Sequence, residues 1–62
     1  GKEPLTPDQL TYMLDLLHED GQDRRLVFET YGYLDRGMSK GHASVQIKKL
    51  KGEFVEPRAV AA

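Results

Sequence analysis

Cationic and short polar side chains gather in the second half of the chain, where their types and spacing suit the binding of a negatively charged ligand. Six of them fall within one short stretch: Lys40, His42, Ser44, Lys48, Lys49 and Lys51. They surround an apolar series, Ala43, Ile47 and Leu50, that would face a protein core if the stretch were helical. The opposite side of that helix would present cations and hydrogen-bonding groups to the major groove of DNA, which is about 12 Å wide.

Groups for catalysis or metal binding are scarce in this sequence. Neither His18 nor His42 is followed three or four residues later by a histidine or carboxylate that would complete a metal-binding helix face. Ser39 and Ser44 lack the sequence pattern that surrounds a catalytic serine, and the chain has no cysteine. The glycines at 37 and 41 do not have the spacing of a phosphate-binding loop. We therefore expect no enzymatic activity, no cofactor and no metal.

The chain is short, and its charge is unevenly distributed. Its 62 residues make one small domain, residues 1–62. A domain of this size buries only about 60% of its unfolded surface and so gains from association. The formal net charge of −1 conceals an acidic first half and a basic second half. Residues 1–35 include three basic and eight acidic residues, whereas residues 36–62 include six basic and two acidic residues. No apolar run is long enough for a transmembrane helix, and we expect a cytoplasmic protein.

The spacing predicts a first helix over residues 6–20. Thr6 is a suitable N-cap, Pro7 follows at the first helical position, and Gln9 completes a capping box. Gly21 is a natural stop, with His18 near the C-terminal end of the helix dipole. One apolar stripe is expected to face the core: Leu10, Met13, Leu14 and Leu17.

A second helix is predicted from Asp23 to Gly37. Its apolar positions recur at helical spacing: Leu26, Val27, Thr30, Tyr31 and Leu34. Gly32 costs about 1 kcal/mol relative to alanine inside a helix, so we expect it to mark a close approach by another helix. The aromatic residues of this segment are expected to pack in the core and at its rim rather than to stack on bases: Phe28, Tyr31 and Tyr33.

The third segment permits two interpretations. As a helix capped by Ser39, it places Ala43, Ile47, Leu50 and Phe54 on one face. As a β-hairpin, it has alternating residues from 45, a turn at 51–52 and a return strand over 53–56. The first interpretation gives an all-α three-helix domain, which we favour; the alternative is an α-helical hairpin followed by a C-terminal β-hairpin. We expect flexible ends over residues 1–4 and 58–62.

The stretch from Gly37 to Leu50 resembles the turn and recognition helix of helix-turn-helix repressors, including winged-helix regulators of the MarR type. A glycine-hydrophobic-serine turn precedes a helix whose core-facing positions are Ala43, Ile47 and Leu50. The resemblance implies a three-helix domain of helix-turn-helix type, although the wing is missing or truncated. It also implies DNA contacts by Ser39, Lys40, His42, Ser44, Val45, Lys48 and Lys49.

The first functional hypothesis is a small DNA-binding transcriptional regulator with its basic third helix, residues 39–51, in the major groove. The lysines and Arg36 would contact phosphates, and the helix N-terminus at Ser39 would also face a phosphate. The base edges would be reached by His42, Ser44 and Gln46. One copy covers one half-site, so a homodimer is expected on double-stranded DNA. The proposed DNA-binding residues are Arg36, Ser39, Lys40, His42, Ser44, Lys48, Lys49 and Lys51.

The second hypothesis is a protein–protein interaction module that does not bind DNA, such as an inhibitor, an adaptor or a dimerisation domain. Apolar residues outside the three predicted stripes are numerous for so small a core, and an interface with a second copy or another protein would bury them. These residues are Tyr12, Leu16, Phe28, Tyr33, Val45, Val55 and Val60.

Overall fold

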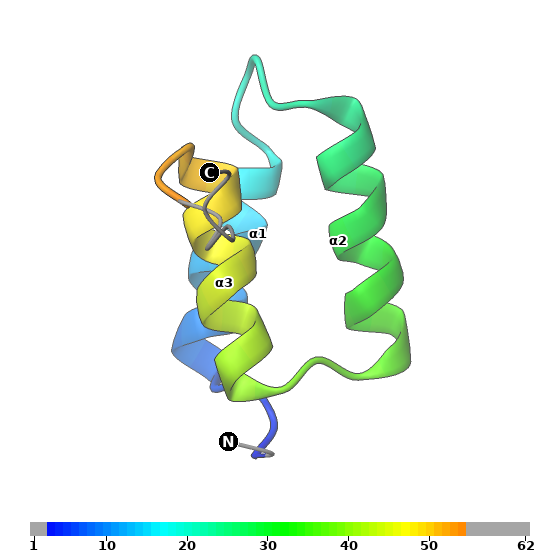
Figure 1. The fold of residues 1–62 in the computed structure, drawn as a ribbon, viewed down its shortest axis with the longest axis vertical. Coiled ribbons are helices and arrows are strands. Elements are labelled where there is room, and N and C mark those ends of the chain that lie inside the picture. Colours follow the sequence, from blue (N-terminus) through cyan, green and yellow to red (C-terminus); the bar gives the residue numbers. More distant parts are fainter. Residues whose placement is uncertain (1–2, 55–62) are drawn as a thin grey trace, which may run out of the picture.

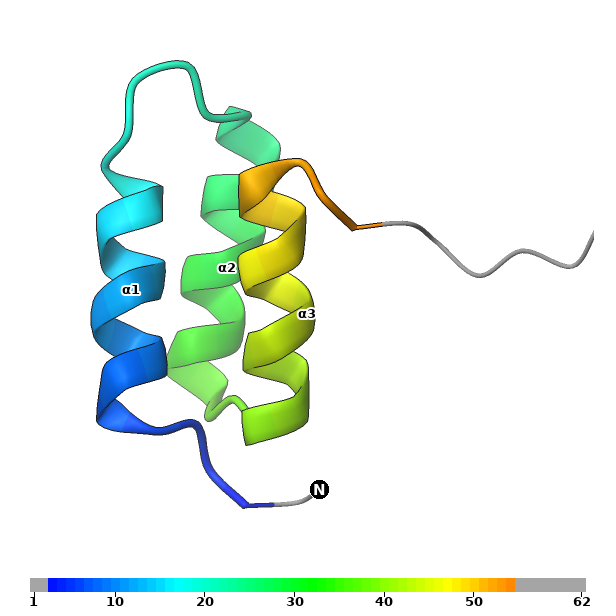
Figure 2. The same ribbon diagram turned by 90° about the vertical axis from the view of Figure 1, so that its left-hand side faces the viewer.

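Three α-helices make up the fold in the computed structural model, which describes residues 3–54 (Figure 1). Helix α1 spans Pro7–Leu17, α2 spans Arg24–Arg36 and α3 spans Lys40–Lys51. The chain runs up through α1, down through α2 and up through α3 (Figures 1 and 2). The all-α three-helix prediction is confirmed. The β-hairpin alternative is wrong for residues 43–54, because α3 continues to residue 51 and these residues contain no strand.

The capping box predicted for α1 is present in full. The Thr6 hydroxyl accepts a hydrogen bond from the Gln9 backbone N–H at 3.0 Å, and the Gln9 side-chain oxygen accepts one from the Thr6 N–H at 2.9 Å. The helix ends at Leu17, three residues before the predicted end. His18 Nδ1 lies 2.8 Å from the Leu14 carbonyl oxygen, so the imidazole ring makes a hydrogen bond with the backbone at the end of the helix. The chain then turns through Gly21 with φ +85°.

Helix α2 begins and ends where the sequence predicts. The Asp23 carboxylate accepts a hydrogen bond from the Arg25 N–H at 2.8 Å, and Gly37 terminates the helix with φ +92°. The expected close approach of another helix at Gly32 is wrong. A Cβ built there would meet only the Arg36 guanidinium, at 4.0 Å.

The start of α3 is held by the N-terminal segment of the chain. Ser39 is the predicted N-cap, and its hydroxyl accepts from the His42 N–H at 3.1 Å. Glu3 lies in the segment that was expected to be flexible, and its backbone carbonyl accepts a hydrogen bond from the Lys40 N–H at 2.6 Å. The Leu5 N–H donates to the Met38 carbonyl at 3.1 Å. These bonds fix residues 3–5 against the α2–α3 connection. The rest of the expected flexible ends, 1–2 and 58–62, lies outside the described residues.

The core lies between α1 and α3, which pack side by side, and α2 contacts α3 less closely (Figure 1). Thr30 is the one buried residue of α2. Ala43 and Leu50 are buried as predicted, whereas Ile47 is half-buried beside the core. The buried apolar residues are Met13, Leu16, Leu17, Met38, Ala43 and Leu50.

The buried side of α1 is rotated relative to the predicted stripe. Leu16, placed outside the stripe, is buried, whereas Leu10, placed within it, is 36% exposed. Met38, in the connection before α3, is a core residue that the helical pattern missed. The rotation follows from packing: α1 buries the side that meets α3, and periodicity alone does not say which neighbour a face will meet. Phe28, expected in the core or at its rim, is 82% exposed.

Candidate nucleic-acid interface on helix α3

The outward side of α3 carries a row of exposed cationic and hydroxyl side chains. Lys40, Ser44 and Lys48 are separated by four residues each and therefore lie along one ridge of the helix, with Lys51 three residues further on. We call these four residues the lysine ridge. At a rise of about 1.5 Å per residue, Lys40 and Lys48 are about 12 Å apart along the helix axis. No acidic residue occurs in α3.

The ridge lysines have few anionic neighbours. Within residues 3–54 the one ion pair joins Lys51 Nζ to the Glu53 carboxylate at 3.4 Å. Interaction with the Tyr12 side chain, followed by that with Glu53, raises the pKa of Lys51, which therefore stays charged at neutral pH. Lys40 and Lys48 have no carboxylate within 4.0 Å in the described part of the chain. Their charges are therefore available to an anionic ligand.

His42 and Lys49, predicted to bind DNA, face α2 instead of lying on the ridge. The His42 ring meets the Tyr33 ring edge-to-face, with 4.4 Å between the ring centres. Lys49 Nζ lies 5.4 Å from the centre of the Phe54 ring, and both His42 and Lys49 are half-buried. Arg36 also stacks on Tyr33, with its Cζ 5.3 Å from the ring centre, but remains exposed at the end of α2. Sequence spacing could not show the contact between His42 and Tyr33, because it joins two different helices.

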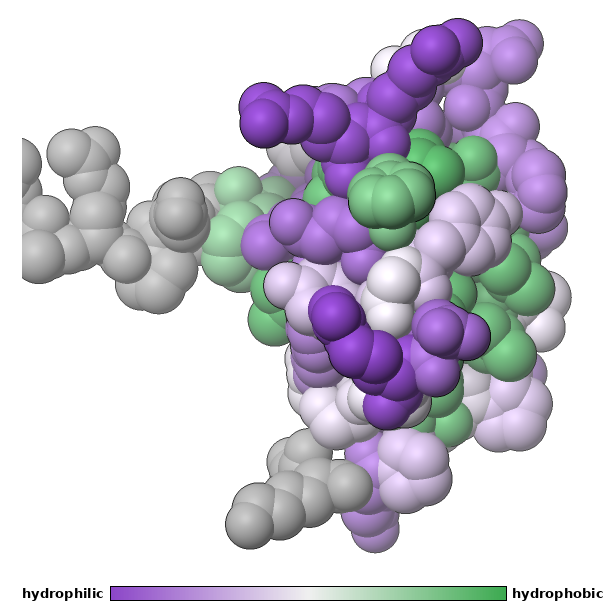
Figure 3. Space-filling model, turned by 90° about the vertical axis from the view of Figure 1, so that its right-hand side faces the viewer, coloured by the Kyte–Doolittle hydropathy of each residue, from purple (hydrophilic) through white to green (hydrophobic). Residues whose placement is uncertain are grey.

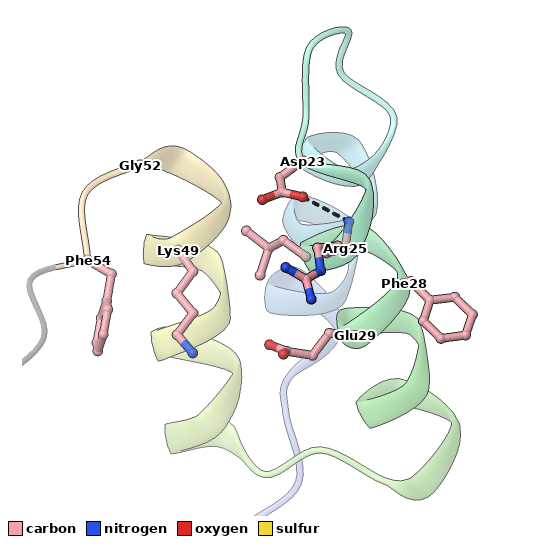
Figure 4. Close-up of a pocket in the computed structure, with 8 residues that line it drawn as sticks. Asp23, Arg25, Phe28, Glu29, Lys49, Gly52 and Phe54 are labelled. Atoms are coloured by element: carbon pink, nitrogen blue, oxygen red, sulfur yellow. Dashed lines mark hydrogen bonds between the residues drawn. The ribbon is translucent and has the colours of Figure 1, made fainter.

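A hollow of about 750 Å³ opens between α2 and the end of α3. Arg25, Glu29 and Lys49 extend toward this space, whereas Phe28 points away from it (Figure 4). The hollow also holds Asp23, so its two cations are balanced by two carboxylates. Such a mixture favours no anion, so Lys49 is less available to an anionic ligand than Lys40 and Lys48.

One of the expected DNA contacts is wrong, and a second is limited by the protein's own hydrogen bonds. Gln46, which was expected to reach base edges, is completely buried, and its amide nitrogen donates to Thr30. At the N-terminus of α3, where backbone N–H groups were expected to face a phosphate, the Lys40 N–H already donates to the Glu3 backbone carbonyl and the His42 N–H to the Ser39 hydroxyl.

Val45 lies at the edge of the candidate interface. It is half-buried and lines a smaller hollow of about 320 Å³ with Ser44, Lys48, Glu53 and Phe54. Val45 is therefore not part of the ridge, and it could contact a ligand only through an apolar group that lies beside the ridge.

Metal binding and membrane insertion find no support in the residues described. No group of three or more histidine, aspartate or glutamate side chains is arranged there to hold a metal ion. Nor does any helix in the described residues combine the length and apolarity that crossing a bilayer requires.

Comparison of the chain with protein-family models, with curated proteins and with solved structures found no match. The resemblance to helix-turn-helix regulators stays a prediction. Helices α2 and α3 run alongside one another in opposite directions (Figure 2), whereas the two helices of that motif cross at about 90–120°.

Proposed function

We propose that this chain is a small double-stranded-DNA-binding domain that places the lysine ridge of α3 across the major groove of DNA. The observation that carries the proposal is the ridge itself: three exposed lysines and a serine on a helix without acidic residues. The separation of about 12 Å between Lys40 and Lys48 is close to the width of the major groove, so the two cations would reach phosphates on either side of it.

In this proposal, different ridge residues would contact different parts of the DNA. Lys40, Lys48 and Lys51 would contact phosphates, which supplies affinity but little sequence preference. Ser44 lies between the first two lysines and would face the base edges as donor or acceptor. Arg36 is exposed just before α3 and would add a fourth phosphate contact. We further propose a cytoplasmic role in transcription regulation, since a small DNA-binding domain of this kind needs access to DNA.

The test is a fluorescence-anisotropy titration of a labelled duplex at two salt concentrations. Four phosphate contacts predict that log K falls against log salt with a slope of about −3.6, so Kd should weaken about 150-fold from 50 to 200 mM salt. Failure to bind any duplex at about 50 mM salt would refute the proposal.

A second candidate function, protein–protein interaction, is favoured by one separate observation. Phe28 is 82% exposed on α2, on the far side of that helix from α3 (Figure 4). An aromatic side chain so exposed gains considerable free energy from burial at an interface. This candidate does not need the lysine ridge, because Phe28 lies on a different surface.

A further inference from the structure

An apolar surface runs along α1 and α2, the two helices that contact each other least. Leu10, Leu14 and Leu17 of α1 are spaced four and then three positions apart, as are Val27, Tyr31 and Leu34 of α2, which puts each set on one side of its helix. Phe28 follows Val27 directly and lies about 100° further round α2. Figure 3, in which α2 lies nearest the viewer, shows apolar surface along the side next to α1. We call this surface the α1–α2 face. Its exposed residues are Leu10, Phe28 and Tyr31, its half-buried residues are Leu14, Val27 and Leu34, and the buried Leu17 borders it.

The α1–α2 face contains both a hollow and a projecting side chain. The hollow, of about 460 Å³, is lined by Leu17, Val27, Phe28 and Tyr31. Phe28 is 82% exposed and Tyr31 is 43% exposed, so the aromatic rings project next to the hollow instead of filling it. A projecting ring beside an unfilled apolar hollow is a shape that can pair with a copy of itself.

The rim of the same hollow carries both signs of charge. Glu19 and Asp20 follow α1 on one side, and Arg24 begins α2 on the other. A two-fold interface brings the same patch of each subunit together, so the patch must be complementary to itself. The rim meets that condition because a two-fold rotation brings the acidic side of one copy, Glu19 and Asp20, opposite the Arg24 side of the other copy.

We propose that the α1–α2 face is the interface of a homodimer in which Phe28 of each copy enters the hollow of the other copy. Arg24 of one subunit would then lie opposite Glu19 and Asp20 of its partner. The proposal does not rest on DNA binding. It nevertheless leaves the lysine ridge of both copies uncovered, because neither rim nor hollow includes a ridge residue.

The size of the face sets the expected strength of the dimer. A helix of 13 residues, such as α2, is about 20 Å long, so two adjacent helices offer an interface at the lower end of the range for specific complexes. We therefore expect a Kd in the micromolar range and a monomer–dimer equilibrium that depends on protein concentration.

The first experiment is sedimentation equilibrium of the full chain between about 10 μM and 1 mM, which brackets the expected Kd. The wild type should change from monomer to dimer across this range. Phe28→Ala should raise the dimer Kd at least about tenfold. Tyr12→Ala is the matched control, because Tyr12 is an exposed aromatic residue near Lys51 of α3, and it should leave the Kd unchanged. A monomer throughout, or equal effects of the two substitutions, would overturn the proposal.

A charge-exchange experiment tests the pairing itself. Arg24→Glu alone would oppose like charges across the interface, and so would the double substitution Glu19→Arg with Asp20→Arg. Each variant should therefore be monomeric on its own, whereas an equimolar mixture of the two should dimerise, since opposite charges then face each other at both rims. Circular dichroism confirms that each variant is folded. A mixture that stays monomeric, or single variants that dimerise like the wild type, would contradict the two-fold pairing.

Discussion

The side-chain amide nitrogen of Gln46 donates a hydrogen bond of 3.0 Å to the hydroxyl of Thr30, and both side chains are completely buried. The Thr30 hydroxyl in turn donates to the Leu26 carbonyl at 2.7 Å. Thr30 is the one buried residue of α2, so this polar bond supplies a specific attachment of α2 to α3. The remaining oxygen, Gln46 Oε1, has no hydrogen-bond partner among the described residues.

The buried pair leads to a prediction about paired substitutions. Thr30→Val removes the acceptor and leaves the Gln46 amide unsatisfied, which should lower the free energy of unfolding by about 1–3 kcal/mol. Adding Gln46→Leu replaces both polar partners by apolar groups of similar size and should restore most of that loss. Urea denaturation followed by circular dichroism measures both effects. A double variant no more stable than Thr30→Val would contradict this account of the pair.

Two glycines should respond in opposite ways to substitution by alanine. Gly32 lies inside α2 with free space around a built Cβ, so Gly32→Ala should stabilise the domain by about 0.5–1 kcal/mol. Gly52 ends α3 in the left-handed conformation at φ +75°, and Gly52→Ala should destabilise the domain by about 1 kcal/mol. Thermal unfolding of both variants checks the signs. A stabilised Gly52→Ala would show that the end of α3 does not need this conformation.

The lysine ridge leads to a comparison of neighbouring residues in α3. Lys48 is exposed on the ridge, whereas Lys49 is half-buried and faces α2. Lys48→Gln should therefore weaken DNA binding at low salt and reduce the magnitude of the salt slope by about 0.9, the value of one phosphate contact. Lys49→Gln removes the same charge and serves as the matched control with a smaller effect. Anisotropy titrations at several salt concentrations measure both, and equal slopes for the two variants would count against the ridge.

Local signals in the sequence placed the starts of the three helices and the end of α2, whereas α1 ends three residues before the predicted end. Thr6, Asp23 and Ser39 were predicted as N-caps, and each accepts the expected backbone hydrogen bond. These bonds span only two or three residues, so the residue type and its position decide them. Gly37 was predicted as the end of α2 and ends it with positive φ, whereas Gly52, which the sequence placed only in a possible hairpin turn, ends α3 in the same way.

The orientation of each helix depended on contacts that the sequence does not show. Gln46 has the residue type of a DNA-contacting side chain, but its position points it into the core toward Thr30. His42 and Lys49 face α2 because that helix lies beside them, and Phe28 is exposed because neither neighbouring helix covers its side of α2. Helical periodicity identifies residues that share a face, whereas tertiary packing decides what each face meets.

Exposure of Phe28 leads to a prediction that separates folding from association. Because the side chain is 82% exposed in the single chain, Phe28→Ala should change the stability of the monomer by no more than about 0.5 kcal/mol. Dimerisation stabilises the folded state by mass action, so the Tm of the wild type should rise with protein concentration across the dimer Kd. The Tm of Phe28→Ala should stay nearly constant over the same range. Scanning calorimetry at low and high concentration measures this difference, and parallel Tm curves for the two proteins would exclude Phe28 from the interface.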